Sequence, residues 1–251
     1  MYNDCVKLWR NGDIKNLMDN FFLKFSYSSI KIENNETRLR DVENVFKSES
    51  IKELKGDKKV LKEIENHKKL CNQIFQLTKE NKPLLSIEIV KKFHKILMNG
   101  CFREELLRKG EKPGEFKKGD YVVGLFDVGA NPEDVETELT SLIDEINEVE
   151  ITEKNALTVV SYFHCWFESI HPFADGNGRV GRMLVNYLLI GNNLPPIILY
   201  QLDRTEYYQA LEVFNDTQEI DLMVDFLDKQ AYKTWEKNYN KRFKCLLDYF
   251  V

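Results

Sequence analysis

Apolar side chains recur at three- and four-residue spacing along most of this chain, which is the period of a helix that is buried on one face. Local signals support this pattern, because Asp57 can cap a following helix and Asn131–Pro132 reads as a cap with proline in the first turn. The spacing predicts helices over residues 13–25, 41–46, 57–77, 86–97, 131–146, 156–170, 180–190, 204–214 and 220–249. The sequence therefore predicts an all-α protein.

One segment interrupts the helical pattern. Residues 114–117 and 121–125 are strand-like, and the Lys118-Gly119-Asp120 turn separates them. Such a pair predicts a small β-hairpin, at about residues 114–126, in an otherwise helical domain. Two interpretations of this hairpin stay open at this point, a functional element beside a site and a stabilising surface hairpin.

Residues 171–182 read His-Pro-Phe-Ala-Asp-Gly-Asn-Gly-Arg-Val-Gly-Arg. Pro172 disfavours the helical conformation at the residue before it, so a helix should end at His171. The apolar run over 180–190 predicts a buried helix that begins near Gly176-Asn177-Gly178. The free N–H groups and the positive dipole end of that helix attract anions, and glycine lets the backbone approach a phosphate closely.

The polar residues of this stretch suit a nucleoside triphosphate. Arg179 and Arg182 share one helix face and can hold phosphate oxygens with planar guanidinium groups. Asp175 fits an anion site only if a cation accompanies the phosphates, and Mg²⁺ binds through one or two carboxylates plus phosphate oxygens. His171 can accept a proton from an attacking hydroxyl near neutral pH. The stretch lacks the lysine of a long glycine-rich P-loop.

Bulk properties narrow the class of protein. The chain has 251 residues, a net charge of −5 and 43% hydrophobic residues, which supports one large core and argues against general nucleic-acid binding. Lysines between residues 52 and 69 alternate with Glu53, Asp57, Glu63 and Glu65, a pattern typical of a solvated helix face. Five scattered cysteines and the absence of a signal-like or membrane-spanning apolar stretch favour a cytoplasmic protein that does not enter a membrane.

The stretch 171–182 resembles the signature of the Fic family, H-P-F-x-[D/E]-G-N-G-R-x-x-R, at every fixed position. The resemblance implies a Fic-type helical bundle with the hairpin as a flap beside the active site, where a target protein docks. It also implies transfer of AMP from Mg·ATP to a protein hydroxyl. In that reaction His171 is the base, Asp175 holds Mg²⁺, and Gly176, Asn177, Gly178, Arg179 and Arg182 bind phosphates.

Two further segments extend the resemblance. Residues 206–215 are similar to the family segment that cradles the nucleobase, which implies that Tyr208 packs on adenine and Asn215 bonds its edge. Ser29-Ile30-Lys31-Ile32-Glu33-Asn34 resembles the inhibitory pattern [S/T]-x-x-x-E-[G/N], within the segment 26–35. In relatives with this pattern the glutamate pairs with the second motif arginine, here Arg182, and displaces the γ-phosphate. Asn34 stands where the commoner form has glycine.

These expectations describe a single domain over residues 1–251, an adenylyltransferase that is inhibited through Glu33 and uses ATP as co-substrate. The resemblance to the family also implies self-modification and a homodimer. Three alternatives remain at this point: a hydrolase that removes AMP from modified proteins on the same fold, a transferase with another donor such as UTP or CDP-choline, and a non-catalytic nucleotide-binding module.

Overall fold

Helices form all the regular secondary structure in the part of the chain that the computed structural model describes, which is residues 1–12, 14–80, 84–121 and 129–243. They are α1 (Tyr2–Asn11), α2 (Ile14–Glu33), α3 (Leu39–Lys47), α4 (Lys58–Glu80), α5 (Ile87–Leu97), α6 (Glu104–Arg108), α7 (Val135–Glu148), α8 (Ala156–Ile170), α9 (Asn177–Gly191), the 3-10 helix η1 (Gln201–Asp203), α10 (Arg204–Thr217) and α11 (Asp221–Phe243). The predicted all-α class is confirmed.

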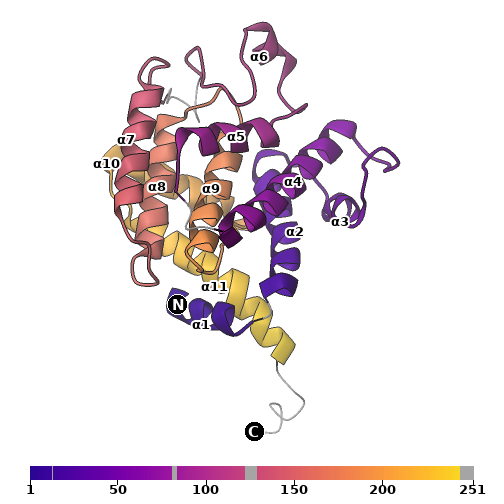
Figure 1. Ribbon diagram of the computed structural model, residues 1–251, viewed down its shortest axis with the longest axis vertical. Helices are drawn as coiled ribbons and strands as arrows, with labels where there is room; N and C mark the ends of the chain where they lie inside the picture. The colour runs from indigo at the N-terminus through magenta and orange to yellow at the C-terminus, as the bar shows by residue number, and fades with distance from the viewer. Residues whose placement is uncertain (13, 81–83, 122–128, 244–251) are drawn as a thin grey trace.

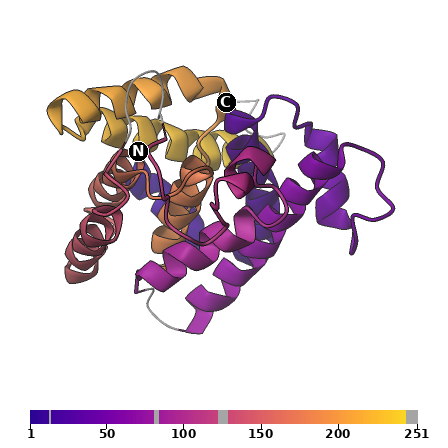
Figure 2. The same cartoon turned by 90° about the horizontal axis from the view of Figure 1, so that it is seen from above.

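Helix α9 is the centre of the bundle, and Figure 1 shows it beside α8 with α5 crossing near its start. Every residue from Arg179 to Ile190 is buried, so the apolar run predicted a central helix correctly. Helices α10 and α11 pack together along one side, as the view from above shows (Figure 2), and α1 lies against α11. Among the described residues, no helix has both the length and the apolar character needed to cross a membrane.

A smaller cluster of apolar residues joins α2, α3 and α4. Its buried members are Ile30, Val42, Val45, Val60, Leu61 and Ile64. At the start of α4, Asp57 accepts hydrogen bonds from the backbone N–H groups of Lys59 and Val60, at 2.8 and 3.0 Å, as its predicted capping role requires. This cluster fixes the last turn of α2, which ends at Glu33, against the start of α4.

The structure extends or shifts several predicted helices. Helix α2 continues to Glu33 rather than ending at residue 25, and α7 begins at Val135 after a turn in which the Asn131 carbonyl accepts from Asp134. Helices α1 and α6 were not predicted. The first buries Tyr2, Cys5, Val6 and Trp9, whereas the second is a single turn with one buried side chain, Leu106. One turn contains too few positions to show a period.

The predicted hairpin is wrong in its first half, because residues 114–117 form turns rather than a strand. Gly114 has a left-handed φ of +88°, and its N–H donates to Nδ1 of His94 at 2.7 Å. The N–H of Lys117 donates to the Pro172 carbonyl at 2.9 Å. These donors bond to separate partners, so they cannot form the repeated ladder of a strand pair. Most of the predicted second half lies outside the described residues.

Candidate functional site

His171 terminates α8 in a left-handed conformation, with φ 49° and ψ 62°, and its N–H still bonds to the Phe167 carbonyl at 3.1 Å. The predicted helix end before Pro172 is therefore confirmed. Two backbone hydrogen bonds flank the imidazole, from Lys117 to the Pro172 carbonyl and from Ala130 to the Ile170 carbonyl, at 2.9 and 3.0 Å. The chain between residues 117 and 130 thus begins and ends beside His171.

The environment of His171 keeps its imidazole neutral. Burial and the nearby ammonium of Lys117 lower its pKa to about 4. A methyl group added to Gly129 would lie 2.8 Å from Cβ of His171 and 3.0 Å from Nζ of Lys117, so both side chains adjoin the same point. At neutral pH the ring carries no second proton, which is the form that accepts one.

The loop from His171 to α9 is held by buried hydrogen bonds. The side-chain amide of Asn177 accepts from the Phe173 N–H at 2.9 Å and donates to the Phe173 carbonyl at 2.7 Å. His94 donates from Nε2 to the Asp175 carbonyl at 2.9 Å, because its Nδ1 already accepts from Gly114, and its ring stacks on Phe173. Asn177 therefore shapes the loop with its side chain and faces the site with its backbone only.

The first turn of α9 offers an anion site. Gly176 precedes the helix with φ +88°, and a side chain there would meet Sδ of Met98 at 2.6 Å, so glycine is required on both counts. The first N–H groups of a helix have no partner within it. A Cβ on Gly178 would lie only 2.6 Å from Oε1 of Glu33. A carboxylate of this chain thus rests where the helix end attracts anions.

Arg182 is buried and binds the end of α2. Its Nε donates to the Ser29 hydroxyl at 3.1 Å, and its Nη2 donates to the Ser29 carbonyl at 3.0 Å and to Oε1 of Glu33 at 2.8 Å. The structure therefore brings Glu33 to Arg182, the pairing that the resemblance implied, and adds two contacts from Ser29. Although burial raises the pKa of Glu33, Arg182 and Arg179 lower it overall, so its carboxylate is ionised.

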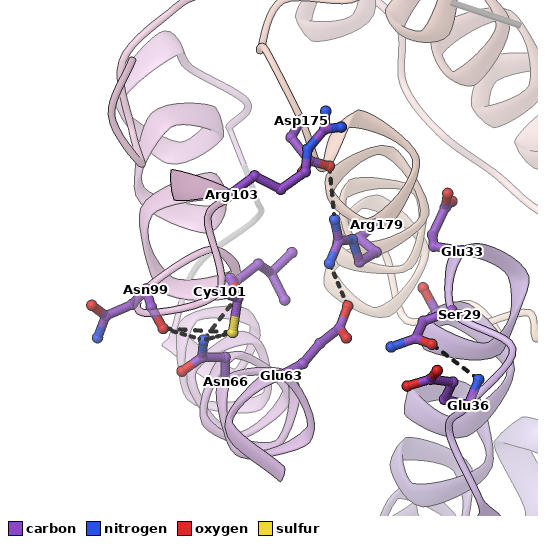
Figure 3. Close-up of polar contacts among 12 residues, drawn as sticks. Ser29, Glu33, Glu36, Glu63, Asn66, Asn99, Cys101, Arg103, Asp175 and Arg179 are labelled. Atoms are coloured by element: carbon purple, nitrogen blue, oxygen red, sulfur yellow. Dashed lines mark hydrogen bonds and ion pairs between the residues drawn. The ribbon is translucent and has the colours of Figure 1, made fainter. Parts of the chain in front are cut away.

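Arg179 binds different carboxylates (Figure 3). Its Nη1 forms a buried ion pair with Glu63 of α4, and its Nη2 lies 3.1 Å from Oδ1 of Asp175. The other oxygen of Asp175, Oδ2, lies 3.2 Å from Nε of Arg103. The two motif arginines therefore have carboxylate partners, and Asp175 lies between Arg179 and Arg103.

Glu63 corrects one prediction from the charge pattern. The alternating charges over residues 52–69 indicated a solvated helix face, but Glu63 is only 5% exposed and faces α9. Its neighbour Glu65 follows the prediction, since it pairs with Lys62 at 2.6 Å at the surface of the same helix. Alternating charge does not reveal which turn of a helix meets a buried arginine.

The predicted nucleobase residues lie on α10. Tyr208 is 46% exposed and lines a pocket of about 710 Å³ together with Ile32, Arg204, Thr205, Gln209 and Glu212. Asn215 is exposed about two turns farther along the same helix. The adjacent Tyr207 is buried instead, where it bonds to His164 at 2.8 Å and its ring lies 5.9 Å from the Arg182 guanidinium.

Sequence reasoning missed the residues that support the motif from other elements. They are Glu63, His94, Arg103 and Lys117, which lie between 55 and 116 positions from their partners in the loop and α9. Glu168 is a further one, because burial raises its pKa to about 8 close to Arg182 and Glu33. The local sequence does not distinguish these residues from other charged or histidine side chains, because their partners lie far away along the chain.

Comparison with known proteins finds similarity to one family. Residues 84–189 match the profile of the Fic/DOC family. The protein adenylyltransferase fic-1 of Caenorhabditis briggsae is 26% identical over 217 residues, which cover 85% of this chain and 40% of that protein. The protein adenylyltransferase Fic of Drosophila persimilis is 32% identical over 103 residues, 41% of this chain and 20% of its own. The chain thus spans two fifths or less of these relatives.

Solved structures share the fold. A Fic domain containing signalling protein from Bacteroides thetaiotaomicron superposes with a TM-score of 0.77 at 21% identity, covering 93% of this chain and 94% of that one. Residues 134–508 of Fic-1 from Caenorhabditis elegans give a TM-score of 0.76 at 20% identity, covering 96% and 70%. The architecture therefore extends over nearly the whole chain, well beyond the segment that matches the family profile.

Proposed function

We propose that this chain, which carries a Fic/DOC-family domain, is a protein adenylyltransferase that moves AMP from Mg·ATP to a hydroxyl of a target protein. The observation that carries the proposal is the short loop that joins His171 to the start of α9. A neutral imidazole stands a few residues before a helix end that can bind an anion, and Asp175 lies between them in sequence. A base, a phosphate site and a carboxylate are the parts that this transfer needs.

Each residue of the site has its own part in the transfer of AMP. His171 takes the proton of the target hydroxyl as its oxygen attacks the α-phosphorus. The bond from that phosphorus to the bridging oxygen breaks, and pyrophosphate leaves. The N–H groups at the start of α9 stabilise phosphate oxygens as charge moves to the leaving group. Arg182 holds the γ-phosphate when Glu33 has moved away.

The geometry fits a Mg²⁺ ion bound through Asp175. In the described part of the chain, no group of three or more acidic, histidine or cysteine side chains is placed to hold a metal alone. One partly exposed carboxylate beside a phosphate site instead suits an ion that completes its shell with phosphate oxygens and water. The ion would neutralise phosphate charge, while Asp175 orients it.

Two surfaces would receive the substrates. The pocket at Tyr208 adjoins Ile32, one residue from Glu33, and we assign the nucleobase to it with Asn215 farther along α10. The target protein would dock along the segment between residues 117 and 130, because hydrogen bonds fix both ends of that segment beside His171. A hydroxyl presented there reaches the base directly.

Glu33 restrains the reaction in this proposal. Its carboxylate contacts Arg182 and lies over Gly178, so it occupies both the γ-phosphate contact and the helix end. The same carboxylate, 34% exposed, favours a second candidate function, because it can orient a water that hydrolyses AMP from a modified protein. The homodimer stays a prediction.

One assay tests the proposal. Wild type, Glu33→Gly and a matched control, Glu36→Gly, are incubated with α-labelled ATP, CTP, GTP and UTP. Glu36 is exposed just after α2 and three residues beyond Glu33, so its replacement changes the same stretch of chain without removing the carboxylate that contacts Arg182. We expect label on protein from ATP, strongest in Glu33→Gly. Label from none of the four donors, with nucleotide still bound, would reject the transferase.

A further inference from the structure

Asp175 lies in a row of four alternating charges that come from four parts of the fold. Glu63 on α4 pairs with Arg179 on α9, Arg179 pairs with Asp175 in the loop, and Asp175 pairs with Arg103 at the start of α6. Figure 3 shows Arg179 between the two carboxylates and Arg103 beside Asp175. Both carboxylate oxygens of Asp175 therefore already have a cationic partner.

The two ends of this row, Glu63 and Arg103, differ in burial. The Glu63 side chain is 7% exposed and that of its partner Arg179 is 10% exposed, so the attraction between them is screened little by salt or water. The Arg103 side chain is 56% exposed and reaches Asp175 through a single contact. Arg103 can thus leave Asp175 at small cost, whereas Glu63 and Arg179 stay together.

A divalent cation at Asp175 must compete with these guanidinium groups. Removing Arg103 takes away the competitor at Oδ2. Removing the charge of Glu63 has the opposite effect, because Arg179 then loses its buried carboxylate partner and repels an incoming cation more strongly. Arg103 acts on the metal through its contact with Asp175 and Glu63 through its contact with Arg179, and neither residue belongs to the motif.

We propose that Arg103 and Glu63 are positioning residues that set the affinity of Asp175 for a divalent cation, in opposite directions. The inference rests on the proposed function only in taking Asp175 as the metal-binding carboxylate. Arg103 weakens binding by occupying Oδ2, and Glu63 strengthens it by neutralising Arg179. Loss of structure alone cannot produce this pair of effects, since damage does not tighten a site.

The test measures metal binding without turnover. Mn²⁺ is titrated into the protein in saturating ADP, and free Mn²⁺ is followed by electron paramagnetic resonance. ADP supplies the α- and β-phosphates and needs no contact with Arg182. We expect Arg103→Met to tighten Mn²⁺ binding about three- to five-fold, the range of a partly exposed ion pair, and Glu63→Gln to weaken it on the order of ten-fold.

Two control variants match these changes. Glu65→Gln removes a surface carboxylate of the same helix as Glu63, and Arg108→Met removes an arginine that pairs with Glu104 in α6, at 3.3 Å. Both should leave the Mn²⁺ titration unchanged. Thermal unfolding shows whether Glu63→Gln is folded, and if it is not, Arg103→Met alone decides. Weaker or unchanged binding in Arg103→Met overturns the inference.

The two proposals fail separately. If wild type transfers AMP but the Mn²⁺ titrations of Arg103→Met and wild type coincide, the inference is wrong and the transferase stands. If the variants shift in opposite directions but no protein becomes labelled, the metal site stands and the transferase is wrong. Both the transferase and the metal-affinity proposal require that Asp175→Asn loses binding of Mn²⁺ in the presence of ADP.

Discussion

The Glu33 carboxylate lies 2.8 Å from Nη2 of Arg182, although 149 positions separate the two residues in sequence. The contact joins the last residue of α2 to the second turn of α9. It places an anion of the protein at the position that we assign to the γ-phosphate. Because the Glu33 side chain is about a third exposed, the pair can open without unfolding the core.

Removal of this carboxylate should activate the protein. A charge-assisted hydrogen bond contributes about 1.5–3 kcal/mol, and the partial exposure of Glu33 places its effect at the low end. We expect Glu33→Gly to raise self-modification about ten-fold, measured as incorporation of α-labelled ATP. Arg182→Ala should not reproduce the gain, since it removes the γ-phosphate contact together with the inhibitory contact to Glu33. Equal labelling of wild type and Glu33→Gly would show that the contact does not inhibit.

His171 should be needed for chemistry and dispensable for nucleotide binding. Loss of a general base costs about 10²- to 10⁴-fold in rate, so His171→Ala should abolish detectable transfer. ATP affinity, measured by calorimetry in the Glu33→Gly background, should change little because we assign the phosphates to the start of α9 and to Arg182. Transfer at the wild-type rate by His171→Ala would remove His171 from the mechanism.

Asp175 should act through a metal. In Asp175→Ala the rate of transfer should depend only weakly on Mg²⁺ concentration, and Mg·ATP should bind less tightly. Asp144, exposed on α7, offers a control that removes a carboxylate far from the loop in sequence. A Mg²⁺ titration curve for Asp175→Ala that superposes on that of Asp144→Ala would exclude Asp175 as the ligand.

The pocket on α10 should recognise the base. Stacking on an aromatic ring contributes about 0.5–1.5 kcal/mol, so Tyr208→Ala should raise the KM for ATP roughly three- to ten-fold with kcat nearly unchanged. Tyr232, which is 38% exposed on α11, provides a control tyrosine outside the pocket lining. The prediction fails if Tyr208→Ala and Tyr232→Ala have the same KM.

The protein should become less stable as the pH is lowered, and His94 is one reason. Burial lowers its pKa to about 3, against about 6.5 in the unfolded chain. Between those values the unfolded state binds a proton that the folded state does not, so this group makes the protein less stable as pH falls below about 6.5. His94→Ala should make the slope of the free energy of unfolding shallower by up to about 1.4 kcal/mol per pH unit between pH 6 and 5.

Urea unfolding at pH 7, 6 and 5 measures that slope. His94→Ala should also be less stable at pH 7, by roughly 2–4 kcal/mol, since a stacked and doubly hydrogen-bonded ring is lost. The two effects are separate, because one is an offset and the other a slope. A parallel shift of the whole pH curve would mean that His94 does not carry the linkage.

Local rules in the sequence determined a good part of this protein. The helix end at His171 follows from the proline after it, and the start of α9 follows from Gly176, whose backbone takes the left-handed conformation that glycine tolerates. The apolar run predicted the central helix. The inhibitory pattern and the motif together indicated that Glu33 and Arg182 would meet. Each of these inferences needs only neighbouring residues or a known pattern.

Tertiary structure alone decided the rest. Whether Glu63 is solvated or buried depends on which side of α4 faces α9, and the charge pattern of α4 is the same in both cases. Arg103 reaches Asp175, and His94 holds the same residue's carbonyl, only because α5 crosses the start of α9. Hydrogen bonds and ion pairs act over a few ångströms in space, so partners this far apart in sequence become known only once the helices are packed.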